Sequence, residues 1–214
     1  MWTRLNSSNN SSLVVDKLCG QGDAGDIAVA CVYCDFHTQN QQSVTGLFGA
    51  LLKQIVSALE PIPDEVQREF ENSKGGVGGL KPLLPDILEM LIKSLSCLRR
   101  VFICIDALDE FPLKHRPELW EHLQQVVRKC PSARLFLTGR PHLRDEVQKY
   151  FPGTAEMLLI SPHERDIGLY LRMRLSRDSE PDVIDKKLEA DILRIIPEAT
   201  SGMYVFYRRI EFQR

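Results

Sequence analysis

The residues best suited to chemistry are the acids that follow a short apolar run. Val101–Ile105 is apolar throughout, and it leads directly into Asp106, Asp109 and Glu110. A buried parallel strand would place these acids at the carboxyl edge of its sheet, where open α/β sheets bind ligands. There Asp106 could hold Mg²⁺ on a nucleotide, and a following acid could orient water. The alternative interpretation is a solvated acidic turn of the kind that follows many strands.

A second apolar run ends in polar residues of a different kind. Ala133–Leu137 is followed by Thr138, Gly139 and Arg140. An arginine at the same sheet edge as Asp106 could bind a γ-phosphate, because its planar guanidinium matches the geometry of phosphate oxygens. A surface arginine after an ordinary strand is the other interpretation.

Four apolar runs of strand length must position these residues. They lack internal alternation between apolar and polar residues, which is typical of strands buried on both faces of a parallel sheet. The fourth run is the least clear. The expected strands are Ile27–Tyr33, Val101–Ile105, Ala133–Leu137 and Glu156–Ile160.

Amphipathic helical patterns separate the expected strands. Apolar residues recur at three- and four-residue spacing, and Ser43 is placed to cap the first of these helices. The expected helices cover about residues 44–59, 83–98 and 118–129. Strands and helices that alternate in this way form βαβ units, which build a parallel sheet with helices on both faces.

After Ile160 the pattern becomes entirely helical. A capping box from Ser161 to Glu164 predicts a helix that continues to about Leu175, and Asp185–Ile196 predicts another. We therefore expect three parts: a start at residues 1–26, an α/β core at 27–160 and a partial helical subdomain at 161–214.

Composition excludes several classes of function. The chain has 27 Lys and Arg residues against 29 Asp and Glu, so no basic surface for nucleic acid is predicted. Its longest apolar run, Ile27–Cys34, is far shorter than a membrane span, and the N-terminus lacks a secretory signal, so we expect a cytoplasmic protein without a membrane partner. The six cysteines are interpreted as reduced core residues. This includes Cys31 and Cys34, whose side chains would point to opposite faces of a strand.

The two edge motifs together resemble a known family. Asp106–Glu110 and Leu137–Pro141 are similar to the Walker B and sensor 1 motifs of NACHT domains, which belong to the STAND class of P-loop NTPases. The closest resemblance is to the nephrocystin-like modules of fungal NOD-like receptor proteins. Val29–Asp35, Leu47–Ile55 and Ser201–Met203 also resemble segments of those modules.

The resemblance implies a P-loop NTPase-like fold and specific site residues. Its implied cofactor is ATP or GTP with Mg²⁺, held through Asp106. Asp109 and Glu110 would take the catalytic positions, and Thr138 and Arg140 would form sensor 1. Other protein domains or further copies of the chain are the implied partners, in a signalling role.

The sequence departs from this family at the phosphate-binding loop. No G-x-x-x-x-G-K-[ST] motif occurs, and the family's Gly-Lys-Thr falls approximately over Asn6–Ser8. The glycine-rich tract Gly75–Gly79 is followed by Leu-Lys-Pro and is interpreted as a loop between helices. The strand that precedes the P-loop, which lies between the sensor 1 strand and the last strand in this fold class, is expected to be missing. That loss would leave Met157–Ile160 without a neighbour, and the tail at residues 205–209 is expected to be unstructured.

Three functions remain open from the sequence. The first is a degenerate or truncated NACHT module that acts through protein interaction, with weak or no nucleotide hydrolysis. The second is a fragment of an active ATP- or GTP-hydrolysing protein whose P-loop lies upstream. The third is a gene fragment without function.

Overall fold

The protein is described by a computed structural model. The residues it describes are 14–20, 27–59, 61–62, 64, 66–68, 71, 82–160, 163–176, 185–200 and 205–210. They belong to two compact units, one that reaches Leu158 and resumes at Phe206, and one between Leu159 and Val205. The sequence segments Asn6–Ser8, Gly75–Gly79 and Ser201–Met203 lie outside the described residues.

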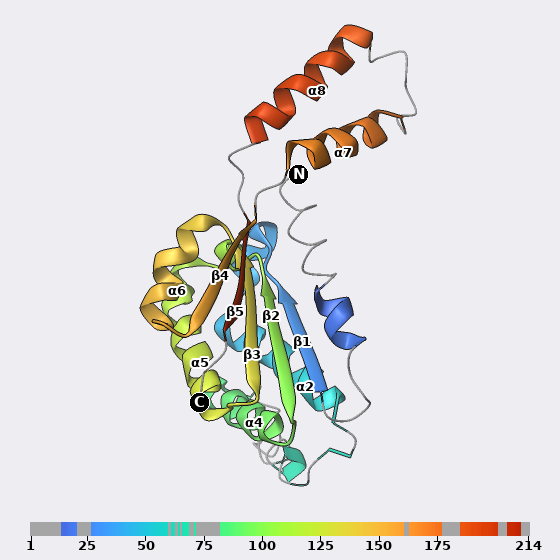
Figure 1. The fold of residues 1–214 in the computed structure, drawn as a ribbon. Helices are drawn as coiled ribbons and strands as arrows, with labels where there is room; N and C mark the ends of the chain where they lie inside the picture. The colour runs from blue at the N-terminus through green and yellow to red at the C-terminus, as the bar shows by residue number, and fades with distance from the viewer. Residues whose placement is uncertain are drawn as a thin grey trace. The chain divides into compact units, whose positions relative to one another are not determined.

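The first unit is built on a sheet whose strand order is β1-β2-β3-β5-β4 (Figure 1). Strands β1, β2 and β3 are parallel neighbours, as the sequence predicts. The bounds are β1 Ile27–Tyr33, β2 Arg100–Asp106, β3 Ala133–Gly139, β4 Ala155–Ile160 and β5 Val205–Ile210.

Strand β2 buries side chains on both faces, whereas β1 buries one face and only half-buries the other. In β2, Val101, Ile103 and Ile105 are fully buried in the main core. The intervening Cys104 is also buried and, with Val15 of the helical residues 14–19, lines a small hollow on the opposite face. A strand covered on both sides cannot show a polar face, so its sequence lacks alternation.

Besides the helical residues 14–19, the helices that accompany the sheet include α2 Val44–Ser57, α4 Leu84–Ser96, α5 Arg116–Lys129 and α6 Arg144–Tyr150. The predicted cap of α2 is present, since Ser43 Oγ accepts a hydrogen bond of 3.1 Å from the Gly46 N–H. Residues such as Leu51, Leu91 and Trp120 pack their fully buried side chains into the core that these helices share with the sheet. The sequence does not predict α6, because seven residues are too few to establish a helical period.

Strand β5 corrects two predictions about the end of the chain. Residues 205–210, of which 205–209 were expected to be unstructured, pair antiparallel with β3. They lie between β3 and β4, so β4 has the neighbour that the sequence analysis expected it to lack. This is the position of the P-loop strand in the fold class that the sequence resembles, and here a strand of opposite direction fills it. Backbone groups of a buried strand need hydrogen-bond partners, and the pairing supplies them to β3.

The second unit contains two helices that contact each other, α7 Glu164–Ser176 and α8 Lys186–Thr200. Asp185 caps α8, because its Oδ1 accepts a hydrogen bond of 2.7 Å from the Leu188 N–H. The predicted cap at Ser161 lies outside the described residues. Within the described chain, no helix combines the length and apolar character that crossing a membrane requires.

Candidate functional site

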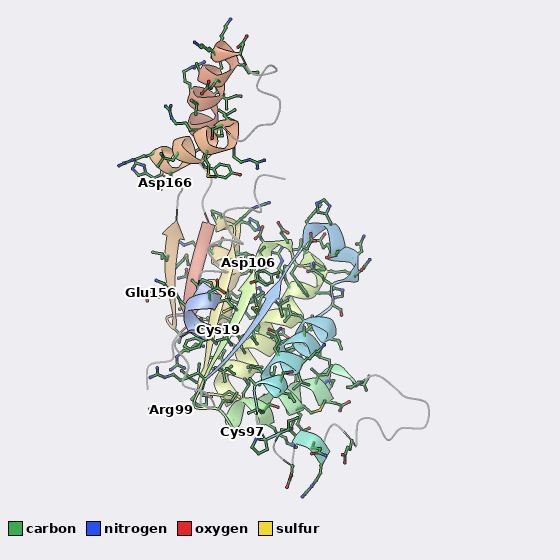
Figure 2. The ribbon with its side chains drawn as sticks, turned by 90° about the vertical axis from the view of Figure 1, so that its right-hand side faces the viewer. Cys19, Cys97, Arg99, Asp106, Glu156 and Asp166 are labelled. Carbon is green, nitrogen blue, oxygen red and sulfur yellow. The ribbon has the colours of Figure 1, made fainter. Side chains whose placement is uncertain are left out.

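The carboxyl ends of β2 and β3 bring Asp106, which is labelled in Figure 2, together with Thr138. The register pairs Ile105 with Leu137, so the next residue of each strand lies beside the other. The Thr138 hydroxyl donates a hydrogen bond to Asp106 Oδ1. The exposed fractions of these residues are only 4% for Asp106 and 1% for Thr138. This contact therefore supplies one of the hydrogen bonds that a buried carboxylate needs.

The chain turns sharply immediately after Asp106. Ala107 has φ 51°, and it is the only residue other than glycine with positive φ in the described part of the chain. Its N–H donates to Thr138 Oγ1 at 2.9 Å, and its carbonyl accepts from the Glu110 N–H at 2.8 Å. Left-handed backbone is unfavourable by roughly 1–2 kcal/mol for an alanine. The turn directs the following 3₁₀ turn η2, Leu108–Glu110, away from the line of the strand.

Asp109 binds Arg140 twice. Its Oδ2 lies 3.3 Å from Arg140 Nε, and its Oδ1 accepts from the Arg140 backbone N–H at 3.2 Å. The Asp109 side chain is 5% exposed and the Arg140 side chain 57% exposed. A buried acid therefore binds an arginine whose side chain is largely exposed. Arg140 reaches the same edge as Asp106, but the acid that it contacts is Asp109.

Gly139 permits this approach. A Cβ at this position would lie 2.5 Å from Leu143 Cδ1 and 3.1 Å from Asp109 Oδ1. No real Cβ tolerates the first distance without movement of its neighbour. A Cβ at Gly139 would therefore require the end of the Leu143 side chain to move.

Glu110 binds the segment that follows β1. Its Oε2 accepts a hydrogen bond of 2.9 Å from the Phe36 N–H, and its carbonyl accepts one of 3.3 Å from Gln39 Nε2. Both donors belong to the 3₁₀ helix η1, Phe36–Gln41. Neither residue is predictable from the sequence, since they bind through a backbone N–H and a side-chain amide that form no motif.

Cys34 is a buried thiol beside these acids. Burial, and then the negative charges of Asp106, Asp109 and Glu110, raise its pKa from 9.0 to about 12. At neutral pH the thiol is therefore protonated. A protonated thiol is a poor nucleophile and a poor metal ligand, so Cys34 acts as a core residue here.

The described residues do not fit a Mg²⁺-nucleotide. The three acids have donors within the protein, and the cavity beside Thr138 and Gly139 has a volume of only about 20 Å³. Pockets for small molecules of nucleotide size usually hold several hundred Å³. A larger cavity of about 220 Å³ lies between Tyr33, Ser43 and Phe111, but no charged side chain lines it. In the part of the chain that is described, no three His, Cys, Asp or Glu side chains are grouped to hold a metal ion.

Comparison with known proteins identifies related sequences for the region that contains this site. A family model described as nephrocystin 3, N-terminal, matches residues 8–140, which include β1, β2, β3 and all five predicted site residues. No curated protein gave a significant match. Among solved structures, the fold search matched phospholethanolamine N-methyltransferase 2 of Haemonchus contortus, in complex with phosphomonomethylethanolamine and S-adenosylhomocysteine. That match has a TM-score of 0.37 and 12% identity over 95% of this chain, which spans about half (53%) of that structure.

Proposed function

This chain belongs to the nephrocystin 3 N-terminal family, and on that basis we propose that it is a degenerate NACHT-type module that acts through protein contacts, with weak or no nucleotide hydrolysis. The observation that carries the proposal is the state of the three acids at the sheet edge. Asp106 accepts from Thr138, Asp109 binds Arg140, and Glu110 accepts from Phe36. Each acid thus stabilises the edge itself.

One oxygen of Asp106 is already bound within this edge, because Thr138 donates to its Oδ1. A hydrogen bond to a charged group contributes about 1.5–3 kcal/mol, and the bond from Thr138 is buried. In active P-loop proteins the backbone N–H groups and the lysine of the phosphate loop supply most contacts to the phosphates. This sequence contains no Gly-Lys pair of the kind that supplies those contacts.

Protein contacts remain available at the same edge. Phe36 is 65% exposed on η1, and Leu113 is 67% exposed on the 3₁₀ turn η3, Leu113–His115. Phe36 itself binds Glu110 through its backbone N–H, and Leu113 follows the turn η2 that contains Asp109 and Glu110. Apolar side chains on an edge of fixed geometry suit the contacts with other domains, or with a second copy, that a NOD-like-receptor-type signalling protein makes.

Titration with fluorescent ATP and GTP analogues, with and without Mg²⁺, tests the proposal. We expect no saturable binding through the micromolar range. Micromolar binding that depends on Mg²⁺ and is lost in Asp106→Ala would overturn it. Glu118→Ala is the control, because Glu118 is an exposed acid in the first turn of α5.

A second candidate is a part of an active NTPase. The side-by-side placement of Asp106 and Thr138 favours it, because a Walker B acid and a sensor residue occupy neighbouring strands in such enzymes. Sequencing the full-length transcript tests this candidate. An in-frame apolar strand with G-x-x-x-x-G-K-[ST] before Met1 would support it, and that strand would have to compete with β5 for its position beside β3.

A further inference from the structure

Strand β1 lies at an edge of the sheet and has the composition of a pairing strand. It is the first strand in the order β1-β2-β3-β5-β4, and among the described strands only β2 pairs with it. Its sequence, IAVACVY, contains no charged residue, no proline and no glycine. Exposed edges of this composition are templates for pairing with another chain.

A side chain of α2 covers the outer edge of β1 at Cys31. The Cys31 N–H donates to Gln54 Oε1 at 2.9 Å, and Gln54 Nε2 donates to the Cys31 carbonyl at 2.9 Å. Nε2 also donates to the Ala50 carbonyl at 3.2 Å, which fixes the amide against its own helix. A primary amide offers one donor and one acceptor side by side, as does the backbone of a neighbouring strand. Gln54 therefore takes the place of a strand at this residue.

Gln54 binds the side of β1 that points away from β2. In a strand, the N–H and C=O of one residue point the same way, and those of the next residue point the opposite way. The Cys34 N–H bonds to the Asp106 carbonyl of β2, so Cys34 and the residues two and four before it face β2. Cys31 and Val29 consequently face outward.

We propose that the outer edge of β1 is a surface for pairing with β1 of a second copy of this chain, and that Gln54 keeps this surface closed. A second copy of β1 is the expected partner, because an uncharged apolar strand meets no electrostatic repulsion from its copy. Two such edges in antiparallel arrangement are related by a twofold axis, which closes the assembly at a dimer. An incoming strand cannot pair with Cys31 while the Gln54 amide occupies both of its backbone groups.

Removing the amide opens the edge. In Gln54→Ala, the Cys31 N–H and C=O lose their partner, and pairing with a second β1 restores one. We expect the wild-type and Lys53→Ala proteins to have equal apparent masses in light scattering after size exclusion under reducing conditions. Lys53 is the matched control, because it is an exposed neighbour on the same helix. The Gln54→Ala protein is expected to shift toward twice that mass as its concentration rises. Equal masses for all three proteins at every concentration would overturn the proposal.

A second variant identifies the edge that pairs. Val29→Pro removes an outward N–H from β1, a position where proline is tolerated in edge strands. The double variant Gln54→Ala/Val29→Pro is expected to return to the wild-type mass with a circular dichroism spectrum like that of the wild type. A dimer that persists in this variant would contradict pairing through β1.

Amide hydrogen exchange provides a measurement that needs no proline variant. In Gln54→Ala, we expect the amides of Val29 and Cys31 to exchange more slowly as the protein concentration rises. Exchange rates at these amides that do not change with concentration would overturn the proposal, whatever the folding of Val29→Pro.

Discussion

The Thr138 hydroxyl donates a hydrogen bond to the Asp106 carboxylate across two neighbouring parallel strands. The same hydroxyl oxygen accepts from the Ala107 N–H, at the left-handed residue where the chain leaves β2. One threonine thus holds both the acid and the turn that follows it.

Thr138→Val is expected to lower the free energy of unfolding by about 2–3 kcal/mol. Valine keeps the shape of threonine, but it leaves the Ala107 N–H without its acceptor and removes a donor from a buried carboxylate. Urea denaturation measures the change. Thr138→Ser keeps the hydroxyl and is the control. Equal stability of the valine and serine variants would show that the hydroxyl contributes nothing.

Gly139→Ala is expected to destabilise the protein by about 1–3 kcal/mol, because the new methyl group overlaps Leu143 Cδ1. The double variant Gly139→Ala/Leu143→Ala removes that overlap, so its two changes should be non-additive in urea denaturation. Gly49→Ala is the matched control on α2, where the nearest atom to the added Cβ lies 3.9 Å away. Glycine is unfavourable inside a helix, so this control should stabilise by up to about 1 kcal/mol. A Gly139→Ala variant as stable as the wild type would contradict the close approach.

Arg140→Ala is expected to have a small effect on stability, below about 1 kcal/mol, since exposed partners contribute little to an ion pair. Asp109→Ala should cost more, because it also removes the acceptor of the Arg140 backbone N–H. A double-mutant cycle on these residues measures the side-chain coupling, which should weaken with added salt. A large coupling that salt does not change would show that the pair is effectively buried.

The raised pKa of Cys34 predicts sensitivity to alkaline pH. The folded thiol titrates near pH 12 and the unfolded thiol near 9.0, so the folded state holds more protons between these values. Its contribution to stability is therefore complete below pH 9 and is lost as pH rises toward 12. Unfolding midpoints across this range measure the loss. Cys34→Ala should fall less steeply than the wild type over the same range, and identical slopes would contradict the assignment.

Local sequence patterns predicted much of the α/β unit. The apolar runs that became β1, β2 and β3 are strands because buried parallel strands require apolar side chains on both faces. Helix α2 and its Ser43 cap follow from a period and a polar residue that lie next to each other in the chain. The placement of Asp106 and Thr138 at one edge follows from the same logic, because parallel strands end together.

Contacts between residues far apart in the chain had no such signal. Three contacts join segments that no local period connects. Strand β5 pairs antiparallel with β3, Gln54 binds Cys31, and Glu110 binds Phe36. The sequence by itself determined which segments form the elements, because side-chain burial imposes a repeat on neighbouring residues. Only the tertiary structure decided which donor satisfies each acid and which strand fills each position in the sheet, because backbone and amide groups of nearly any residue can serve as partners once folding brings them within reach.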